Sequence, residues 1–351
     1  NNGFTKNNFK KGLVMIENQT QPPHLTRHPK LQIDINTINK FFTYSNSYPG
    51  KPATLQEIGP VWETVLSDWT LSSVDIFTAI ENKDFESLIK IYENYYIQGV
   101  SEGASTGKAF ESKDIGGVGE NYKHQKNIRN INRIKQLGVF LGIESENLYD
   151  IIHSINDRIS IPNSINQGQT WGWWFGDIFV HFELSDYIYF LDSISTVLKD
   201  LNLTKTIFLG DGSGLLSTLV YNNCNINSSY HIDLGHFLFK QFLNNPDRND
   251  IQYYYAEGFN PSTPMEAEIL INQDSFPEMS DESVKKYIKN IKLNEIPYVL
   301  SYNKSVTFEG GCIHSDWKSE LLKQGYTLIS SLSPTMREGY VIEVFELKNN
   351  G

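Results

Sequence analysis

The feature that most constrains the fold is an alternation of short apolar runs with amphipathic segments, which begins near residue 204. Apolar runs of strand length between turn residues predict buried strands, and apolar residues at helical spacing predict helices. Strands that alternate with helices form a parallel sheet with helices on both faces. The expected strands are 206–209, 230–234, 251–255, 267–272 and 297–302, and the expected helices are 215–221, 237–243, 283–291 and 317–324.

Two apolar runs at the end of the chain, 326–331 and 340–347, are joined by a turn-rich link and predict a pair of antiparallel strands. Such a pair at one side of a parallel sheet makes the sheet mixed. The fold class expected for residues 204–351 is therefore α/β, with a Rossmann-like parallel sheet that closes with a C-terminal antiparallel hairpin.

The first 203 residues have a different pattern, which divides into two expected regions. Residues 1–70 are broken by prolines, so we expect an irregular arm with one helix near 34–42. Residues 71–203 are expected to be mainly helical, to cap the ligand cleft and to help build the acceptor pocket. Within them, helical spacing occurs in 76–92, 127–141 and 184–201, and loops are expected at 99–119 and 162–176.

Composition excludes several classes of protein. The chain of 351 residues is 39% hydrophobic and 20% charged, which is typical of a globular protein. Its 30 basic and 41 acidic residues give a net charge of −11, which disfavours a nucleic-acid partner. Cys224 and Cys312 are too few for a disulfide framework or a cysteine-rich zinc site. Because no apolar run approaches the roughly 18 residues of a membrane span and the first residues lack a signal-peptide core, we expect a soluble, cytoplasmic protein.

The most informative motif is the glycine turn, defined as residues 210–214, between an expected strand and an expected helix. Gly210 allows a tight turn, Gly212 lets a ligand lie against bare backbone, and Gly214 lets the helix pack closely. The start of the helix offers N–H groups to a carboxylate or phosphate. Asp233 ends the next strand, 19 residues beyond Gly214, where an acid can accept hydrogen bonds from ribose hydroxyls. The alternative is a plain turn beside a solvated aspartate.

The spacing G-x-G-x-G, a ribose acid and a closing antiparallel hairpin together resemble the class I S-adenosylmethionine-dependent methyltransferases. A dinucleotide dehydrogenase would more usually have G-x-G-x-x-G, whereas this chain has Leu215 at the last position. One departure is Phe208, which stands where many methyltransferases carry an acid, and Asp211 or a backbone group is expected to substitute for it. The resemblance implies S-adenosylmethionine as cofactor.

A second segment, 272–279, follows the fourth expected strand and contains Ser-Phe-Pro-Glu-Met. This segment, together with Ile232-Asp233-Leu234, Tyr298…Asn303 and the closing Arg337-Glu338-Gly339-Tyr340, resembles the sugar O-methyltransferase family over roughly residues 110–347. The resemblance implies methyl transfer to a sugar hydroxyl in surface-glycan or natural-product biosynthesis. Methylation of a non-sugar small molecule and a non-catalytic nucleotide-binding scaffold are the alternatives.

A sugar hydroxyl needs a base within hydrogen-bond reach, or a metal, to react at neutral pH. Asp274 and Glu278 are the first candidates, because they lie four residues apart beside the expected cofactor cleft. The alternatives are a helix cap for Asp274 and a buried salt bridge, with Arg337 as a possible partner, for Glu278. His314 is the next candidate, and His124 follows the glycine-rich loop and could reach over the site. Magnesium would suit carboxylates, but no compact cluster indicates a metal.

The remaining candidates contact the two ligands. Phe259 and Asn260 are expected at the adenine, although a plain surface loop would explain them equally well. Trp171 belongs to a tryptophan-rich segment that could stack on a sugar ring or fill a core. The expected cofactor residues are Gly210, Asp211, Gly212, Ser213, Gly214, Asp233, Leu234, Phe259, Asn260, Asn272 and Gln273, and the expected substrate residues are Tyr122, His124, Trp171, Ser275, Asn303 and Arg337.

Overall fold

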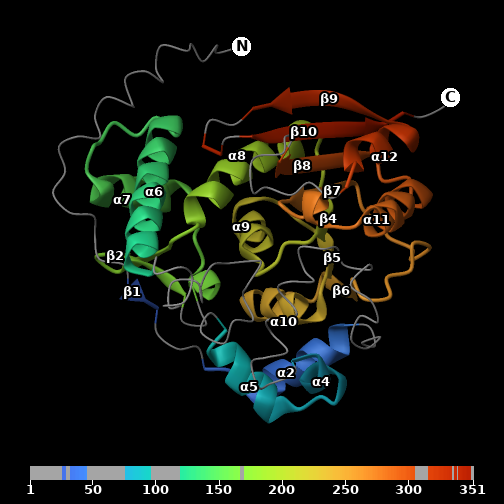
Figure 1. Cartoon of the computed structure of the whole chain (residues 1–351), viewed down its shortest axis with the longest axis horizontal. Helices are drawn as coiled ribbons and strands as arrows, with labels where there is room; N and C mark the ends of the chain where they lie inside the picture. Colours follow the sequence, from blue (N-terminus) through green and yellow to red (C-terminus); the bar gives the residue numbers. More distant parts are fainter. Residues whose placement is uncertain are drawn as a thin grey trace.

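The computed structural model describes residues 26–28, 32–45, 76–95, 119–166, 170–304, 315–333, 336–337 and 339–348. These residues form a seven-stranded sheet with helices on both faces, a small three-stranded sheet and two groups of N-terminal helices (Figure 1).

The large sheet has the strand order β6-β5-β4-β7-β8-β10-β9. Its first five strands are parallel, and β10 runs antiparallel to both β8 and β9. From β4 the chain adds β5 and then β6 on one side, and it later returns to place β7 on the other side of β4. The position between β4 and β7 is the switch point, where α/β sheets bind ligands. The fold class expected from the sequence is confirmed. The strands are β4 (Lys205–Leu209), β5 (Ser228–Asp233), β6 (Ile251–Tyr255), β7 (Ile269–Gln273), β8 (Tyr298–Lys304), β9 (Tyr326–Leu332) and β10 (Tyr340–Leu347).

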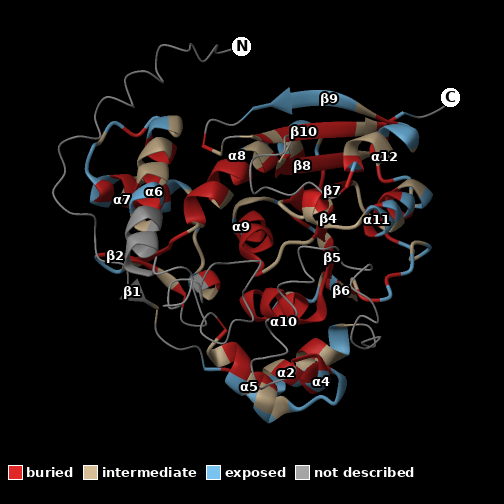
Figure 2. Ribbon diagram, in the orientation of Figure 1, coloured by how far each residue is buried: buried red, intermediate tan, exposed pale blue. Residues whose placement is uncertain are grey.

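Helices cover both faces of this sheet (Figure 1). One face carries α8 (Leu184–Asp200), α9 (Leu215–Asn223) and α10 (Gly235–Asn244), and the other carries α11 (Asp281–Leu293) and α12 (Trp317–Lys323). The central strands and the helix α10 are almost entirely buried (Figure 2). Such complete burial explains why the strands are continuous apolar runs, since both faces of each strand meet a hydrophobic layer.

The segment expected as a loop at 162–176 contains a strand instead, so that prediction is wrong. β2 (Trp171–Phe175) pairs with β1 (Thr26–Arg27) and with β3 (Ile178–His181). Trp173 is buried and Trp174 is exposed, which is the two-residue alternation of a strand. A Cβ atom on Gly172 would lie 2.1 Å from the carbonyl oxygen of Val180, so the glycine permits the close pairing. Before this strand, the same segment contains the short 3₁₀ helix η4 (Asn163–Asn166).

The N-terminal helices form two groups that pack at different places. The helix α6 (Gly119–Phe140) lies beside α8, and α7 (Leu148–Arg158) packs against α6 (Figure 1). The helices α2 (Ile35–Tyr44) and α4 (Ile76–Glu81) lie beside α10, and α5 (Phe85–Glu93) packs against both of them. The helical pattern of 76–92 is interrupted because Lys83 adopts φ 52° and Asp84 caps a new helix through the backbone N–H of Ser87. Tyr92 ties the second group to the sheet domain with a 2.5 Å hydrogen bond to the His236 carbonyl oxygen.

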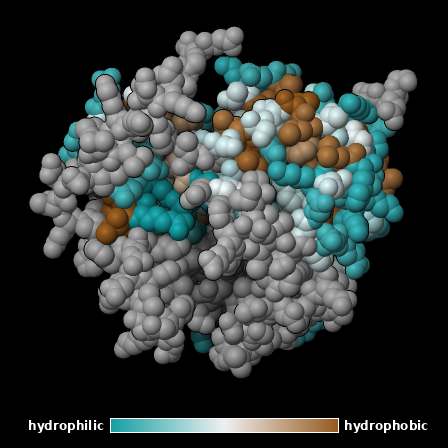
Figure 3. Space-filling model, turned by 45° about the horizontal axis from the view of Figure 1, so that its top comes forward, coloured by the Kyte–Doolittle hydropathy of each residue, from teal (hydrophilic) through white to brown (hydrophobic). Residues whose placement is uncertain are grey.

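The strand β9 is the most exposed strand of the large sheet (Figure 2). Its side chains Leu328, Ile329 and Leu332 are each about half exposed. Figure 3, which brings the β9 side of the sheet forward, shows hydrophobic residues gathered on that side of the molecule. None of the helices in the described part of the chain combines the length and the apolar character that crossing a bilayer requires.

Candidate functional site

The glycine turn links β4 to α9 and is built from left-handed backbone. Gly210, Gly212 and Gly214 have φ of 68°, 57° and 77°, a region that residues with a Cβ atom seldom adopt. A Cβ atom on Gly210 would lie 2.2 Å from Oγ of Ser275, and one on Gly214 would lie 2.9 Å from Cγ of Gln241. Two of the three glycines are therefore required both by backbone conformation and by their neighbours.

Asp233 lies at the carboxyl end of β5 and contacts the glycine turn directly. Its Oδ2 accepts hydrogen bonds from the backbone N–H of Gly212 and from Nε2 of Gln241, each 2.8 Å long. Its Oδ1 accepts a 2.8 Å hydrogen bond from the backbone N–H of Leu234. A carboxylate oxygen has two acceptor positions, so Oδ1 keeps one for a ligand hydroxyl. Burial raises the pKa of Asp233 to about 8, although the hydrogen bonds of Leu234 and Gly212 oppose this shift.

Asp211 caps the helix that follows the turn. Its Oδ2 accepts a 3.1 Å hydrogen bond from the backbone N–H of Ser217 in the first turn of α9. Burial raises the pKa of Asp211 to about 7, and the hydrogen bonds from Ser217 oppose this shift. The helix start that was expected to offer its N–H groups to a ligand is thus partly satisfied by the protein itself.

The loop after β6 contains both adenine candidates. Phe259 is buried and packs against Tyr287, with ring centroids 5.2 Å apart. Asn260 is exposed, and its side chain accepts a hydrogen bond from the backbone N–H of Ser262. Between these residues and β6 lies Glu257, whose Oε1 accepts a hydrogen bond from the N–H of Gly235. Its Oε2 is buried with no hydrogen-bond partner among the described residues, and burial raises the pKa of Glu257 to about 7.

Asn272 connects three parts of the site from inside the sheet. Its Nδ2 donates to the Leu209 carbonyl oxygen at 2.9 Å and to Oγ of Ser275 at 2.6 Å. Its Oδ1 accepts from Nδ2 of Asn303 and from the backbone N–H of Phe276. Asn272 and Asn303 are completely buried, so in this structure they hold the end of β4 against β7 and β8.

The two carboxylates of the second motif differ in their surroundings. Asp274 adopts φ 61° as the chain leaves β7, and its Oδ2 lies 2.5 Å from Nη1 of Arg337. The salt bridge that was considered for Glu278 therefore belongs to Asp274. Glu278 ends the short helix η5 (Phe276–Glu278). Burial and the nearby charge of Asp274 raise the pKa of Glu278 to about 8, so it is largely protonated at pH 7.

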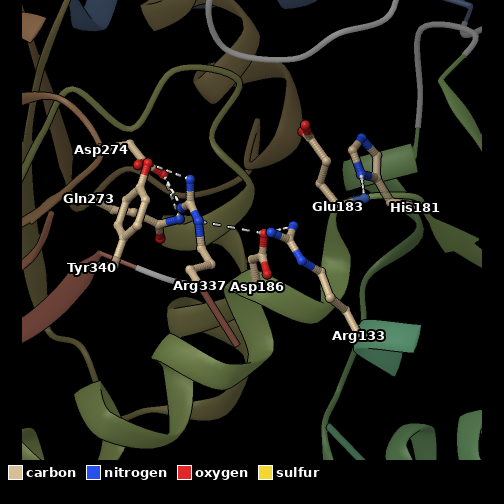
Figure 4. A network of polar contacts seen from close by, with 8 residues as sticks. All are labelled: Arg133, His181, Glu183, Asp186, Gln273, Asp274, Arg337 and Tyr340. Carbon is tan, nitrogen blue, oxygen red and sulfur yellow. Dashed lines mark hydrogen bonds and ion pairs between the residues drawn. The ribbon is translucent and has the colours of Figure 1, made fainter. Parts of the chain in front are cut away.

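Arg337 belongs to a charged network that continues into the N-terminal region (Figure 4). Its Nη2 donates to the hydroxyl of Tyr340 at 2.7 Å, and its Nε lies 3.9 Å from Oδ2 of Asp186. The same Asp186 oxygen lies 2.6 Å from Nη1 of Arg133 on α6. Oδ1 of Asp186 is buried and has no hydrogen-bond partner among the described residues. Four segments that are distant in sequence thus share one set of ion pairs, here called the charge network (Arg133, Asp186, Asp274 and Arg337).

The other predicted site residues occupy varied places. Gln273 lies at the end of β7, and its Oε1 is buried without a hydrogen-bond partner in the described part of the chain. Ser213 and Leu234 are buried at the turn and at the start of α10, and Trp171 is half-buried in β2. Tyr122 and His124 fall in α6, but their side chains lie outside what the structure describes, and His314 lies outside the described residues altogether.

Sequence reasoning missed several residues that the fold brings to the site. Arg133 and Asp186 lie on helices whose spacing indicates only packing, and Gln241 lies on the buried helix α10. Burial raises the pKa of Tyr187 on α8, and the carboxylates of Glu183, Asp274 and Asp211 raise it further. For Asp186 and Gln241 the available signal was a polar residue within an apolar helix, since a buried polar group needs a partner. Arg133 gave no such signal, because α6 is rich in polar residues.

The cofactor site fits an adenosyl ligand at three points. The glycine turn lacks Cβ atoms at the switch point, Asp233 keeps an acceptor position beside it, and Glu257 has a buried oxygen available one strand further along. These are acceptors for ribose hydroxyls and for a donor on a base. Among the residues that the structure describes, no three His, Cys, Asp or Glu side chains are grouped so that they could hold a metal ion.

Comparison with known proteins finds distant structural likenesses. No family model matches the chain, and no curated protein matches it. The solved mitomycin 7-O-methyltransferase MmcR is 12% identical with a TM-score of 0.38, and the match covers 47% of this chain and about half, 54%, of that one. The N-methyltransferase NodS of Bradyrhizobium japonicum, solved with S-adenosyl-L-homocysteine, is 12% identical with a TM-score of 0.38, covering 48% and 88%. A methyltransferase from Clostridium acetobutylicum is 11% identical with a TM-score of 0.36, covering 47% and 93%.

The strand order decides the fold class. This order is that of the Rossmann-like sheet of class I methyltransferases. In the sheet the glycine turn follows the first strand, Asp233 ends the second, and Asp274 follows the fourth. The three motifs found in the sequence therefore all lie at the carboxyl edge of the sheet, where ligands bind.

Proposed function

We propose that this protein is an S-adenosylmethionine-dependent O-methyltransferase that methylates a hydroxyl group of a sugar. The observation that carries the proposal is the direct hydrogen bond between the Gly212 backbone and the Asp233 carboxylate at the switch point of the sheet. This contact joins a turn without side chains to an acid that can accept ribose hydroxyls, which is the arrangement that an adenosyl ligand needs.

The cofactor would be held by the glycine turn, by Asp233 and by the loop after β6. Asp233 would bind the ribose through the open position on Oδ1, and Glu257 would accept a donor from the adenine or ribose through Oε2. S-adenosylmethionine supplies a methyl group on a sulfonium, which is a strong electrophile, so the protein's main task is to hold the acceptor in line with it.

The acceptor would lie beside the charge network. Each carboxylate there is paired with an arginine, so the network combines donors and acceptors while its charges largely cancel. The hydroxyl of Tyr340 adds a further polar group beside Arg337 (Figure 4). Such a surface suits a neutral molecule with many hydroxyl groups, because each hydroxyl can both donate and accept.

Of the two carboxylates, Glu278 is the better candidate for the general base. Asp274 is already engaged in an ion pair with Arg337. Glu278 has its pKa raised to about 8, mainly by burial and then by Asp274, and a base works best when its pKa is near the working pH. Its ionised form would take the proton from the sugar hydroxyl, while Asp274 and Arg337 orient the acceptor. His314 and His124 are the alternative bases, and their side chains lie outside what the structure describes.

A small acceptor molecule agrees with the net charge of −11, which disfavours nucleic acid as a partner. The proposed enzyme has three regions, which are an arm at 1–70, a helical region at 71–203 and a catalytic domain at 204–351. It would act in the cytoplasm.

Calorimetric titration of S-adenosylmethionine tests the cofactor half of the proposal. The wild-type protein should bind, and Asp233→Ala should weaken binding by about 1–3 kcal/mol, because the hydrogen bonds between this carboxyl group and the ribose hydroxyls are lost. Asp247→Ala is the matched control, since the side chain of Asp247 is 99% exposed at the surface. Absence of binding by the wild type would indicate a scaffold protein, and unchanged affinity in Asp233→Ala would contradict the ribose role.

The acceptor half is tested by transfer of labelled methyl groups. A panel of free sugars, glycosides and non-sugar phenols and acids would be incubated with the protein and labelled cofactor. Label should appear in a sugar product that is stable to mild acid and base, as an ether is. Label in the non-sugar acceptors alone would leave a methyltransferase of a different substrate class.

A further inference from the structure

The carbonyl oxygens of the glycine turn are held by two amide side chains of one helix. Nε2 of Gln241 donates to the Gly212 carbonyl oxygen at 3.0 Å. Nδ2 of Asn244 donates to the carbonyl oxygens of Ser213, at 2.9 Å, and Gly214, at 3.3 Å. Gln241 and Asn244 are three residues apart on α10, so they share one face of the helix. Consecutive peptide groups of the turn are therefore fixed by a helix that the sequence motif does not include.

Gln241 also joins the turn to the ribose acid. Its Nε2 donates to Oδ2 of Asp233, which accepts in addition the N–H of Gly212. Gly212, Asp233 and Gln241 thus form a closed ring of hydrogen bonds. If the Gln241 amide turned over, its oxygen would face the Gly212 carbonyl and the Asp233 carboxylate, which are both acceptors.

A buried hydrogen-bonded relay, formed by His231 of β5 and Tyr221 of α9, also supports this orientation of the amide. Nδ1 of His231 lies 2.6 Å from Oε1 of Gln241, and Nε2 of His231 lies 2.5 Å from the hydroxyl of Tyr221. Burial lowers the pKa of His231 to about 4, so the ring is neutral and carries one proton. That proton lies on Nδ1, because Oε1 can only accept, so Tyr221 donates to Nε2 and Ser229 donates to Tyr221 at 2.5 Å.

The second amide is oriented in the same manner. Nζ of Lys240 donates to Oδ1 of Asn244 at 2.6 Å, and an ammonium group has no acceptor. The Nδ2 group of Asn244 must then face the turn. Lys240 is almost completely buried, and burial lowers its pKa to about 7. A neutral amine could also accept a hydrogen bond, but a reversed amide would then direct its oxygen at the carbonyl oxygens of Ser213 and Gly214, which are both acceptors.

We infer that Gln241 and Asn244 are positioning residues for the cofactor, and that His231 with Tyr221 and Lys240 fix the direction of their amides. The two amides hold the backbone of the turn and the Oδ2 side of Asp233, which leaves Oδ1 toward the ligand. The inference rests on the proposed function, because it assigns these residues a role in binding the adenosyl ligand. It predicts that groups which cannot touch that ligand nevertheless control its affinity.

The experiment measures the dissociation constant of S-adenosylhomocysteine and the melting temperature of the same variants. Gln241→Met keeps the length of the side chain and removes both ends of its amide, so affinity should fall about tenfold or more, which corresponds to the loss of roughly one charged hydrogen bond. Tyr221→Phe removes a single oxygen from the relay and should weaken binding about threefold, because His231 can then adopt its other tautomer. Gln252→Met makes the same substitution at an exposed position of β6 and should leave affinity unchanged.

Rescue distinguishes orientation from mere packing. His231→Phe should weaken binding as Gln241→Met does, whereas His231→Asn keeps a donor near the position of Nδ1 and should restore most of the affinity. A purely structural role would lower the melting temperature of all these variants equally and leave the dissociation constant of the folded protein unchanged, and that result would overturn the inference. Failure of the wild type to bind the ligand would instead overturn the proposed function.

Discussion

The glycine turn and the charge network lie at the same edge of the sheet but are held in different ways. The turn is fixed by backbone conformation, by hydrogen bonds that α10 donates to its carbonyl oxygens, and by the hydrogen bond that it donates to Asp233 at the end of β5. The charge network is fixed by ion pairs between side chains that come from α6, α8, the end of β7 and the segment before β10. The first region therefore depends on geometry, and the second depends on the balance of charge.

The difference agrees with what each region would bind. A cofactor of constant shape is best met by a site that does not adjust, since preorganised groups lose little freedom on binding. An acceptor recognised through many hydroxyls is met by long side chains that are held by their opposite charges. If this contrast is correct, small changes of shape should damage the turn, and changes of charge should damage the network.

The largest expected effect is on catalysis in Glu278→Gln. The substitution keeps the shape of the side chain and removes its ability to accept a proton, so the rate of methyl transfer should fall about 10²–10⁴-fold, as for loss of a general base. Cofactor affinity should be unchanged. In the wild type the rate should rise with pH up to about 8, because burial and Asp274 raise the pKa of Glu278 to about 8 and only the ionised form is a base. A wild-type rate in the variant would transfer the role to Asp274 or a histidine.

The second effect tests the dependence of the turn on shape. Gly210→Ala should lower the free energy of unfolding by about 3 kcal/mol, from left-handed strain together with overpacking. The overpacking arises because the new Cβ atom would lie 2.2 Å from Oγ of Ser275. Gly142→Ala is the matched control: Gly142 has the same φ of 68° but no atom within 4 Å of the added carbon. Equal losses in chemical denaturation would mean that the close approach of Ser275 is unimportant.

The contrast between the two regions also explains what the sequence could predict. The positions of the glycine turn and of Asp233, and the α/β fold class, were predictable because they depend on spacing within about 30 residues of chain and on the alternation of strands and helices. Both elements of the C-terminal hairpin were predicted for the same reason, and β10 has the expected bounds.

The charge network was not predictable in this way, since Arg133, Asp186, Asp274 and Arg337 are separated by long stretches of chain. Only tertiary packing shows that Arg337 pairs with Asp274 and not with Glu278. Gln241 was missed because a polar residue in an apolar helix does not indicate which partner it will meet. The strand β2 was missed because its tryptophans and glycines obscured the two-residue alternation.

A third, smaller effect tests the dependence of the network on charge. Arg337→Met should lower the free energy of unfolding by about 2 kcal/mol, less than for a fully buried pair, because Asp274 remains 34% exposed and can be hydrated. The variant should also bind the acceptor more weakly while it retains cofactor affinity. Lys286→Met breaks a surface pair with Glu282 on α11 and should change stability by only about 0.3–0.5 kcal/mol. If the two variants lost equal stability, the network would be no more than a set of surface pairs.

A fourth effect asks whether the cofactor region is in fact insensitive to charge. Glu257 is buried beside it, and burial raises its pKa from the ordinary 4.5 of a glutamate to about 7. Between these two pH values the folded protein binds more protons than the unfolded chain, so this group makes the ligand-free protein less stable as pH rises from 4.5 to 7. At about 1.4 kcal/mol for each pKa unit, Glu257→Gln should remove roughly 3 kcal/mol of this pH-dependent loss. Denaturation at pH 5 and pH 8 would measure it, with Glu282→Gln on the exposed side of α11 as control. An unchanged slope would mean that Glu257 stays hydrated, and that the two regions differ even more in their sensitivity to charge.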